Sequence, residues 1–266
     1  MKYQSFAMLG AAVLVSGCAG QKDVELDQTK LTGVHRVAVV GPADPVPVAV
    51  FTERQADAQK AMAAAAAIPF AGVLGAAIAG GVAGGISAEI ARETSEPMAK
   101  KVEEEHYKLS EAMQASLVAS LKSSGYDATA VSFTRANPAK FPDNYDSIKD
   151  QADLVLDATA TATCSNVDSG KSTHFRPVVV MNVHLVRASD HTLVMHKQFV
   201  LDDATAKPDT YHIQGETTFD IPDYDALKAD VGKCLDGVKA AVPLLTQSVA
   251  ATLARSPQTA AATPLQ

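Results

Sequence analysis

Residues 176–203, RPVVVMNVHLVRASDHTLVMHKQFVLDD, contain two apolar, β-branched runs on either side of the short polar segment 188–191. Two such runs joined by a few turn-forming residues predict a β-hairpin with long strands. The first run is apolar at consecutive positions, so both faces of its strand need cover. We therefore expect a sheet with helices packed on at least one of its faces.

Three further segments are predicted strands, at residues 35–42, 126–133 and 152–165. Two segments have apolar residues at helical spacing. The first runs from 95 to 125, with Ser95 as the expected N-cap, Pro97 in the first turn and Gly125 as the stop,. The second begins at Asp223, and we expect Pro243 to kink or divide it,. This order predicts an α/β fold: a single mixed sheet with a C-terminal β-hairpin and amphipathic helices packed on it.

An Ala/Gly-rich insert at residues 56–92 interrupts this pattern. Its segment 68–90, IPFAGVLGAAIAGGVAGGISAEI, lies in a stretch with no charged residue between Lys60 and Glu89. In a helix, the large residues would form one row and the small ones a second, which includes Gly72, Gly80 and Gly84,. A row of small residues lets another helix approach closely. Three interpretations remain open: a membrane-inserted helix, a close-packed helical hairpin or oligomer seam, and a disordered loop.

The N-terminus has the layout of a secretory signal peptide at residues 1–17, with Lys2 followed by an apolar run,. Its end, Val15-Ser16-Gly17-Cys18, resembles the lipobox of bacterial lipoproteins. That resemblance implies cleavage before Cys18, acylation of Cys18 and, with Ala19 next, anchoring in the outer membrane. The alternatives are a simple signal peptide, or an uncleaved anchor in which the cysteine falls there by chance.

The remaining chain divides by composition. Residues 18–33 are polar without periodicity and predict a flexible, lipid-anchored tether,. Residues 34–255 form the predicted periplasmic α/β domain, and residues 256–266 a disordered tail,.

The succession of strand 35–42, helix, Ala152-Asp153-Leu154-Val155-Leu156 and the hairpin around Leu185-Val186-Arg187-Ala188-Ser189-Asp190 resembles a known family. It is similar to the periplasmic domain of curli-secretion-channel-like lipoproteins and to that of the penicillin-binding-protein-activator lipoproteins. The insert resembles the glycine-zipper segments of other envelope lipoproteins. These resemblances imply a non-enzymatic role in envelope assembly or secretion, with a protein partner in the periplasm or outer membrane.

Two cysteines, Cys164 and Cys234, remain for the folded domain. In an oxidising compartment they could form a disulfide, and otherwise they are two separate buried thiols. Their separation of 70 positions fits no zinc-binding pattern,.

Other candidate sites are weak. Ser169-Gly170-Lys171-Ser172 lacks the earlier glycine of a phosphate-binding loop, since position 165 is Ser,. His184 and His196 would face each other across the hairpin only if its loop had an odd number of residues. We expect ordinary sheet histidines there, with no metal or cofactor. No catalytic motif is present, so we expect a protein that is not an enzyme.

The net charge of −7 argues against nucleic acid as a partner,. Three functional hypotheses remain. The first is a lipoprotein that binds a protein partner, with the zipper for self-association or membrane contact. The second is a pore-forming oligomer of zipper helices. The third is a ligand- or metal-binding domain that uses His184 and His196.

Overall fold

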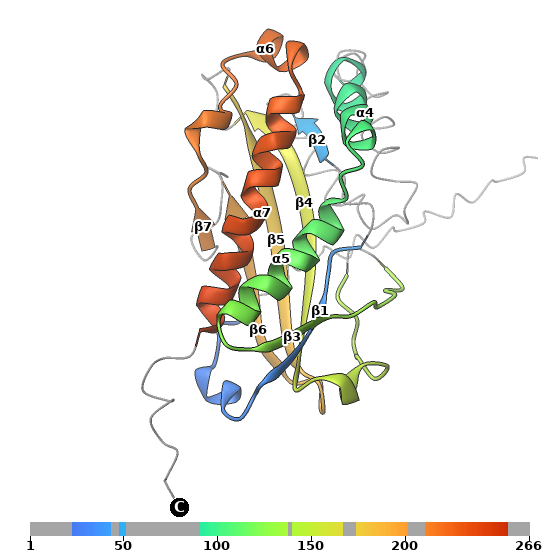
Figure 1. Ribbon diagram of the computed structural model, residues 1–266, viewed down its shortest axis with the longest axis vertical. Coiled ribbons are helices and arrows are strands. Elements are labelled where there is room, and N and C mark those ends of the chain that lie inside the picture. Colours follow the sequence, from blue (N-terminus) through green and yellow to red (C-terminus); the bar gives the residue numbers. More distant parts are fainter. Residues whose placement is uncertain are drawn as a thin grey trace, which may run out of the picture.

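The computed structural model describes residues 23–43, 48–51, 91–137, 140–166, 174–201 and 211–254 (Figure 1). These residues form a seven-stranded sheet. Its strands are β1 (Arg36–Val40), β2 (Val48–Phe51), β3 (Asp127–Ala130), β4 (Leu154–Asn166), β5 (Phe175–Arg187), β6 (Leu193–Leu201) and β7 (Tyr211–Ile213). The α-helices are α4 (Glu96–Glu104), α5 (Leu109–Ser123), α6 (Tyr224–Ala229) and α7 (Gly232–Leu253). Shorter helical turns are η1 (Gln28–Leu31), η4 (Ala91–Ser95), η5 (Lys149–Gln151) and η6 (Thr217–Phe219).

The sheet is mixed, which confirms the predicted α/β class. Its strand order is β3-β1-β4-β5-β6-β7. β1 runs parallel to β3 and β4, whereas β5 is antiparallel to both β4 and β6. β2 pairs with the far end of β4, so β1 and β2 follow one another along the same edge of that long strand.

Helices α5 and α7 pack together on one face of the sheet (Figure 1). The predicted helical spacing is confirmed here, because the recurring apolar residues are the buried ones. In α5 these are Leu109, Met113, Leu117 and Leu121, and in α7 they are Leu235, Val238, Val242, Leu245 and Val249. Most of them join Leu154, Leu156 and residues of β5 and β6 in the main core.

The opposite face of the sheet is covered at one end by the described residues of the segment 131–152, which are 131–137 and 140–152. Leu154 and Leu156 of β4 belong to the core under α5 and α7, while Val155 between them contacts a second cluster. Alternate residues of a strand point to opposite faces. The second cluster includes Tyr145, Ile148 and Ala152 of this segment. The irregular segment therefore buries apolar residues of one face of the sheet, as helices α5 and α7 bury those of the other face.

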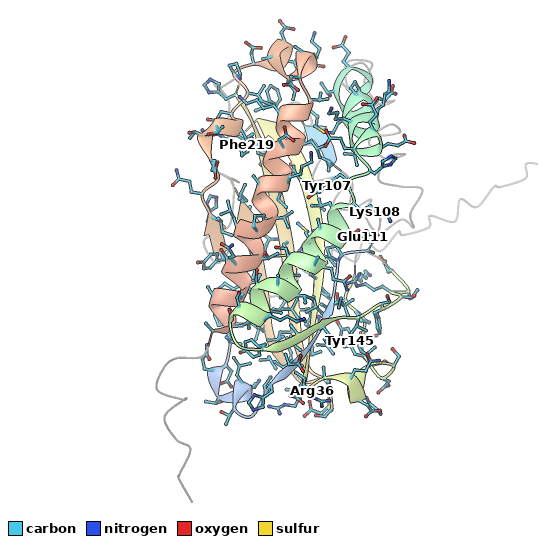
Figure 2. The ribbon with its side chains drawn as sticks, viewed as in Figure 1. Arg36, Tyr107, Lys108, Glu111, Tyr145 and Phe219 are labelled. Atoms are coloured by element: carbon cyan, nitrogen blue, oxygen red, sulfur yellow. The ribbon has the colours of Figure 1, made fainter. Side chains whose placement is uncertain are left out.

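Asp153, which follows Ala152 directly before β4, joins the starts of β1 and β4. Its carboxylate accepts hydrogen bonds from the backbone N–H groups of His35 and Arg36, both at 2.9 Å. It also forms a salt bridge of 3.0 Å with the Arg36 side chain. Burial would raise the pKa of Asp153, but these hydrogen bonds hold it below its ordinary value. Arg36 lies near the lower end of the molecule as viewed in Figure 2.

The predicted hairpin is confirmed, with residues 188–192 between β5 and β6. If the pairing of Val186 with Leu193 continued without a shift, His184 would lie opposite Met195 and not opposite His196. The register shifts by one residue, however, because Leu185 pairs with Met195 and Val186 with Leu193, which leaves Val194 as a β-bulge,. The bulge brings His184 directly opposite His196.

The single helix expected at 95–125 was wrong, because the chain breaks into α4 and α5. His106 adopts a left-handed φ of 48° and Lys108 is extended, which turns the chain between them. Packing accounts for the break: Met98 of α4 contacts the cluster around Val50 and Cys234, whereas α5 covers the main core. Ser95 occupies the predicted N-cap position of α4 but makes no capping hydrogen bond, since it is helical and its hydroxyl accepts a hydrogen bond from Val50 N.

Pro243 does not divide the C-terminal helix. The break falls earlier, at residues 230–231, where Asp230 ends α6 in a non-helical conformation. Asp223 is the N-cap of α6, with its carboxylate accepting from Ala226 N at 2.8 Å. Pro243 lies inside α7 on its exposed side, where water can hydrogen-bond the carbonyl that a proline leaves unpaired,.

The flexible tether expected at 18–33 is wrong for residues 24–31. Val24 exchanges both backbone hydrogen bonds with His196 of β6, at 2.8 and 3.0 Å. Leu31 is buried in the main core, and η1 is capped by Asp27. Glu25 forms a salt bridge of 2.8 Å with Lys197. The folded domain therefore begins at Val24, ten residues earlier than expected.

Several predictions lie outside the described residues: the signal peptide, Cys18, the zipper segment with Gly72, Gly80 and Gly84, the segment 169–172 and the tail 256–266. Within the described ranges, none of the helices has the length and apolar character that crossing a membrane requires.

Candidate functional site: a buried polar row

One row of the sheet carries three titratable side chains on neighbouring strands. Asp157 of β4 pairs with His184 of β5, which pairs in turn with His196 of β6. Directly paired residues project from the same face of a sheet. Because Leu156 and Ala158 on either side of Asp157 belong to the core under the helices, the row lies on the opposite face.

Asp157 binds two residues of the covering segment. Arg135 donates to both carboxylate oxygens of Asp157, through Nη2 to Oδ1 and through Nε to Oδ2. Tyr145 donates its hydroxyl proton to Asp157 Oδ2 at 2.8 Å. Arg135 Nη2 also donates to the carbonyl oxygens of Gly41 and Ala158, both at 3.0 Å. Arg135 thus connects the covering segment to β4 and to the end of β1.

This ion pair is closed to solvent. The Arg135 and Asp157 side chains are 2% and 0% exposed. Burial raises the pKa of Asp157, and the hydrogen bonds and charge of Arg135 oppose that rise. Burial and the neighbouring carboxylate also raise the pKa of Tyr145, so its phenol stays protonated and remains a donor. Each charge here depends on its partner, because an unpaired charge in such a place is costly.

The rings of His184 and His196 contact each other edge to face in the same row as Asp157. Their ring centroids lie 5.7 Å apart in an edge-to-face arrangement, and the Phe141 ring lies 4.7 Å from His184 and 5.6 Å from His196. Both Nδ1 atoms are buried with no hydrogen-bond partner among the described residues. Burial and the charge of His196 lower the pKa of His184 to about 4, and burial lowers that of His196. Both imidazoles are therefore neutral at pH 7.

The next row of the same face is a hydrogen-bonded ladder. Gln198 donates to Asn182 Oδ1 at 2.9 Å, and Asn182 donates to Thr159 Oγ1 at 3.4 Å. The pairing register places these three side chains on β6, β5 and β4. Two successive polar rows therefore cross the three central strands.

The arrangement suits a structural role better than proton transfer. The carboxylate of Asp157 is already engaged by Arg135 and Tyr145. Asp157 was not among the residues predicted to form a site. In the sequence it is marked only as an acidic residue within a strand of apolar residues and threonines. In the part of the chain that is described, no three His, Cys, Asp or Glu side chains are grouped as a metal site would need. His184 and His196 come together as one hypothesis required, but Phe141 covers them.

Cys164 and Cys234 are also brought together, at the other end of β4. Both are fully buried in one apolar cluster with Val50, Met98 and Phe175. Burial, together with the neighbouring Cys164 thiol, raises the pKa of Cys234 well above its ordinary value. They are unbonded and buried in the structure, as the interpretation as two separate buried thiols expects, and they share one cluster.

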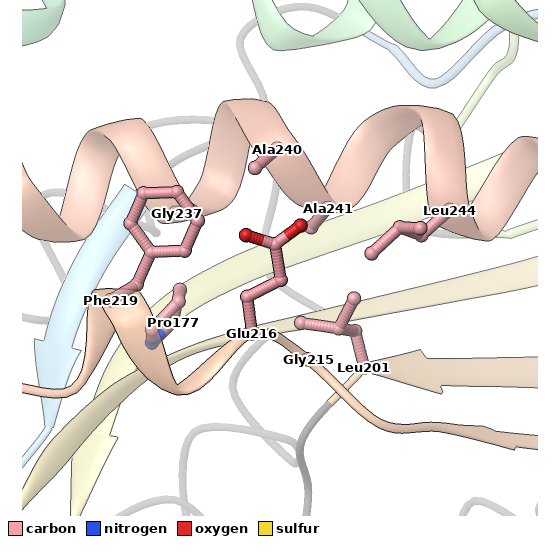
Figure 3. A pocket seen from close by; sticks show the side chains of 9 residues that line it. All are labelled: Pro177, Leu201, Gly215, Glu216, Phe219, Gly237, Ala240, Ala241 and Leu244. Carbon is pink, nitrogen blue, oxygen red and sulfur yellow. The ribbon is translucent and has the colours of Figure 1, made fainter.

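A shallow cleft lies between α7 and the segment 215–219 (Figure 3). Figure 3 shows Glu216 reaching toward Ala240 and Ala241, and the Phe219 ring beside Gly237. The empty space of about 200 Å³ here includes open solvent, so the cleft encloses much less than the roughly 300–1,000 Å³ of small-ligand sites,. Gly237 explains the close packing here: an added Cβ would lie 2.5 Å from Pro177 Cγ and 3.0 Å from Phe219 Cβ.

Comparison with known proteins finds no matching family model and no matching curated protein. Among solved structures, two PelC dodecamers from Paraburkholderia phytofirmans match at 11% identity, with TM-scores of 0.30 and 0.32 and coverage of 88% of this chain and 96% of theirs. A protein from Helicobacter pylori described as a neuraminyllactose-binding hemagglutinin homolog matches at 12% identity, with a TM-score of 0.33 and coverage of 86% and 89%. Likenesses with TM-scores this low assign the chain to no family and support no statement on its function or assembly.

Proposed function

We propose that this chain is a non-enzymatic outer-membrane lipoprotein whose α/β domain binds a protein partner at the periplasmic face during envelope assembly or secretion. The observation that carries the proposal is the tetrapeptide Val15-Ser16-Gly17-Cys18 after an apolar signal-like segment,. A diacylglycerol thioether at Cys18 plus an N-acyl chain gives more than the two anchoring signals that stable membrane attachment needs.

The early start of the folded domain adds a geometric constraint to this proposal. Only residues 19–23 separate Cys18 from Val24, which is hydrogen-bonded to β6. Six chain steps span at most about 20 Å. A lipid on Cys18 would therefore hold the domain against the bilayer, with the part of β6 around His196 within about that distance of it. The partner we expect is accordingly one in the outer membrane or lying close to its periplasmic surface.

The polar rows support a scaffold role within this proposal. The carboxylate of Asp157 and the two imidazoles are buried and engaged with neighbouring side chains, so they fix the segment 131–152 on the sheet. In this proposal the buried polar contacts keep the domain surface rigid, and the partner binds that surface. Fold alone does not select that partner.

Replacing Cys18 with serine tests the anchor. In cells fed an alkyne-tagged fatty acid, the wild-type chain is expected to carry the tag and to partition into the detergent phase. Cys18→Ser is expected to carry no tag, because a serine hydroxyl cannot form the thioether. The measurement is tag fluorescence in each phase, normalised to the amount of the chain.

The matched control is Cys234→Ala, which removes a thiol but leaves Cys18 in place and should keep the tag. Crosslinking in the same cells should attach a second protein to the wild-type chain and much less of it to Cys18→Ser. A wild-type chain without the tag would contradict the anchor, and adducts that contain only copies of this chain would contradict the separate partner.

The zipper segment is proposed to drive self-association or membrane contact. Gly80→Leu with Gly84→Leu would place bulky side chains on the small-residue row and separate close-packed helices,. In detergent, we expect the wild-type chain to form a larger assembly than this variant by light scattering. The control is Ile78→Leu, a change on the large-residue row. Equal masses for all three chains would exclude self-association through the zipper.

A further inference from the structure

The end of β4, strand β2 and the first turn of α7 meet in an apolar cluster in the upper half of the molecule (Figure 1). Cys164 lies in β4, paired in register with Val50 of β2. Cys234 lies in the first turn of α7. Both are 0% exposed and belong to this one cluster. The fold therefore brings the two cysteines together in one buried apolar environment.

We propose that Cys164 and Cys234 form a disulfide that ties the start of α7 to β4. A disulfide needs its two sulfur atoms about 2.05 Å apart and its Cβ atoms about 4 Å apart. Two fully buried cysteines in one cluster need only small side-chain movements to reach that geometry. The proposal rests on this juxtaposition and holds whether or not Cys18 is lipidated.

The chemistry is a two-electron thiol–disulfide exchange. One cysteine loses its proton, and its thiolate attacks a disulfide oxidant such as oxidised glutathione, which forms a mixed disulfide and releases one glutathione thiolate. The second cysteine then loses its proton and attacks the mixed disulfide at the first cysteine's sulfur. One S–S bond forms in the protein, the second glutathione leaves, and the oxidant has been reduced to two thiols.

Burial determines when this exchange can occur. The attacking species is the thiolate, and the folded environment opposes its formation because the cluster is apolar,. A small oxidant also cannot reach sulfurs that are fully covered. The bond should therefore form before α7 docks on β4, or during a transient opening, and it should then resist reduction in the folded chain.

Closure would link positions that are 70 residues apart and enclose β5, β6, β7 and α6 in one covalent loop. A loop of that length constrains the unfolded chain strongly. The start of α7 also follows directly on the break at residues 230–231. The bond would therefore fix the N-terminal end of α7 to the sheet, next to the point where the chain changes direction.

The test refolds the reduced full-length chain with oxidised and reduced glutathione, traps free thiols with an alkylating reagent, and maps the peptides by mass. We expect the Cys164 and Cys234 peptides to be joined, with two hydrogens lost, and Cys18, in a chain that carries no lipid, to be alkylated as a free thiol. Free Cys164 and Cys234 after equilibration, or joining of either to Cys18, would overturn the proposal. Neither result depends on the tag at Cys18, so this proposal and the proposed function can fail separately.

Thermal unfolding provides the second readout. The oxidised chain should unfold roughly 10 °C above the reduced one. The double variant Cys164→Ala with Cys234→Ala is the control, because its unfolding temperature should not respond to reductant. The reduced wild-type chain is prepared with reductant in denaturant and refolded, because the folded chain should resist reduction. If it then unfolds at the same temperature as the oxidised chain, the disulfide is not formed. The peptide map decides the question on its own if the variant does not fold.

Discussion

Replacing Asp157 with alanine is expected to lower the free energy of unfolding by about 3–5 kcal/mol, the cost of leaving a buried charge without its partner. The charge left behind is Arg135, whose side chain is 2% exposed and which has Asp157 as its counter-ion. Tyr145 also loses the acceptor of its hydroxyl. Because domains are stable by only about 5–15 kcal/mol, this variant should be close to unfolding. Urea unfolding followed by circular dichroism measures the loss.

A set of matched variants separates the charge from the packing. Tyr145→Phe removes one hydrogen bond and should cost only about 1 kcal/mol. The triple variant Arg135→Met, Tyr145→Phe and Asp157→Leu removes every polar member of the cluster, so it should recover much of the stability lost in Asp157→Ala. If Asp157→Ala is as stable as Tyr145→Phe, the ion pair does not hold the covering segment.

Lowering the pH from 6.5 to 4 is expected to remove on the order of 3 kcal/mol of stability through His184. The pKa of His184 is lowered to about 4 in the folded chain, against about 6.5 when unfolded,. In that window the unfolded chain binds a proton that the folded chain does not, so stability falls as the pH falls. His196, whose pKa is also lowered, acts in the same direction, although the charge of Asp23 raises its pKa somewhat.

His184→Phe keeps an aromatic ring against Phe141 and removes the titrating group. Its free energy of unfolding should vary less between pH 6.5 and 4.5 than that of the wild-type chain, while the control His35→Gln, a change at an exposed histidine, should not alter the slope. Asp153 has a lowered pKa, so its contribution is present above its unfolded pKa and is lost only at lower pH. Identical slopes for His184→Phe and the wild-type chain would contradict the role of His184.

Local patterns predicted the elements whose burial follows a simple period. The β5–β6 hairpin and the buried faces of α5 and α7 were predictable because each residue's environment is set by its own element. The break at His106 was not, because the apolar spacing continues across it and only packing on two different clusters separates α4 from α5. Residues 24–31 were predicted to be a tether because most of their side chains are polar. What fixes them is a backbone pairing of Val24 with β6, which side-chain patterns do not indicate.

The polar row shows a similar limit. His184 and His196 could be singled out from the sequence, but their pairing depends on the bulge at Val194, and nothing in an apolar run indicates which residue will be skipped. Arg135 and Tyr145 come from an irregular segment, whose path over the sheet is fixed by the contacts it makes there. Charged and aromatic residues in such a segment usually lie at the surface, so their burial against Asp157 has no local signal,.

The mass of the N-terminal peptide of the native chain tests the lipoprotein proposal most directly. We predict that the mature chain begins at Cys18 and that this residue carries a diacylglycerol thioether and an N-linked acyl chain. A native chain that begins at Met1, or one whose Cys18 carries no lipid, would contradict the anchor and with it the proposed place of this protein in the envelope.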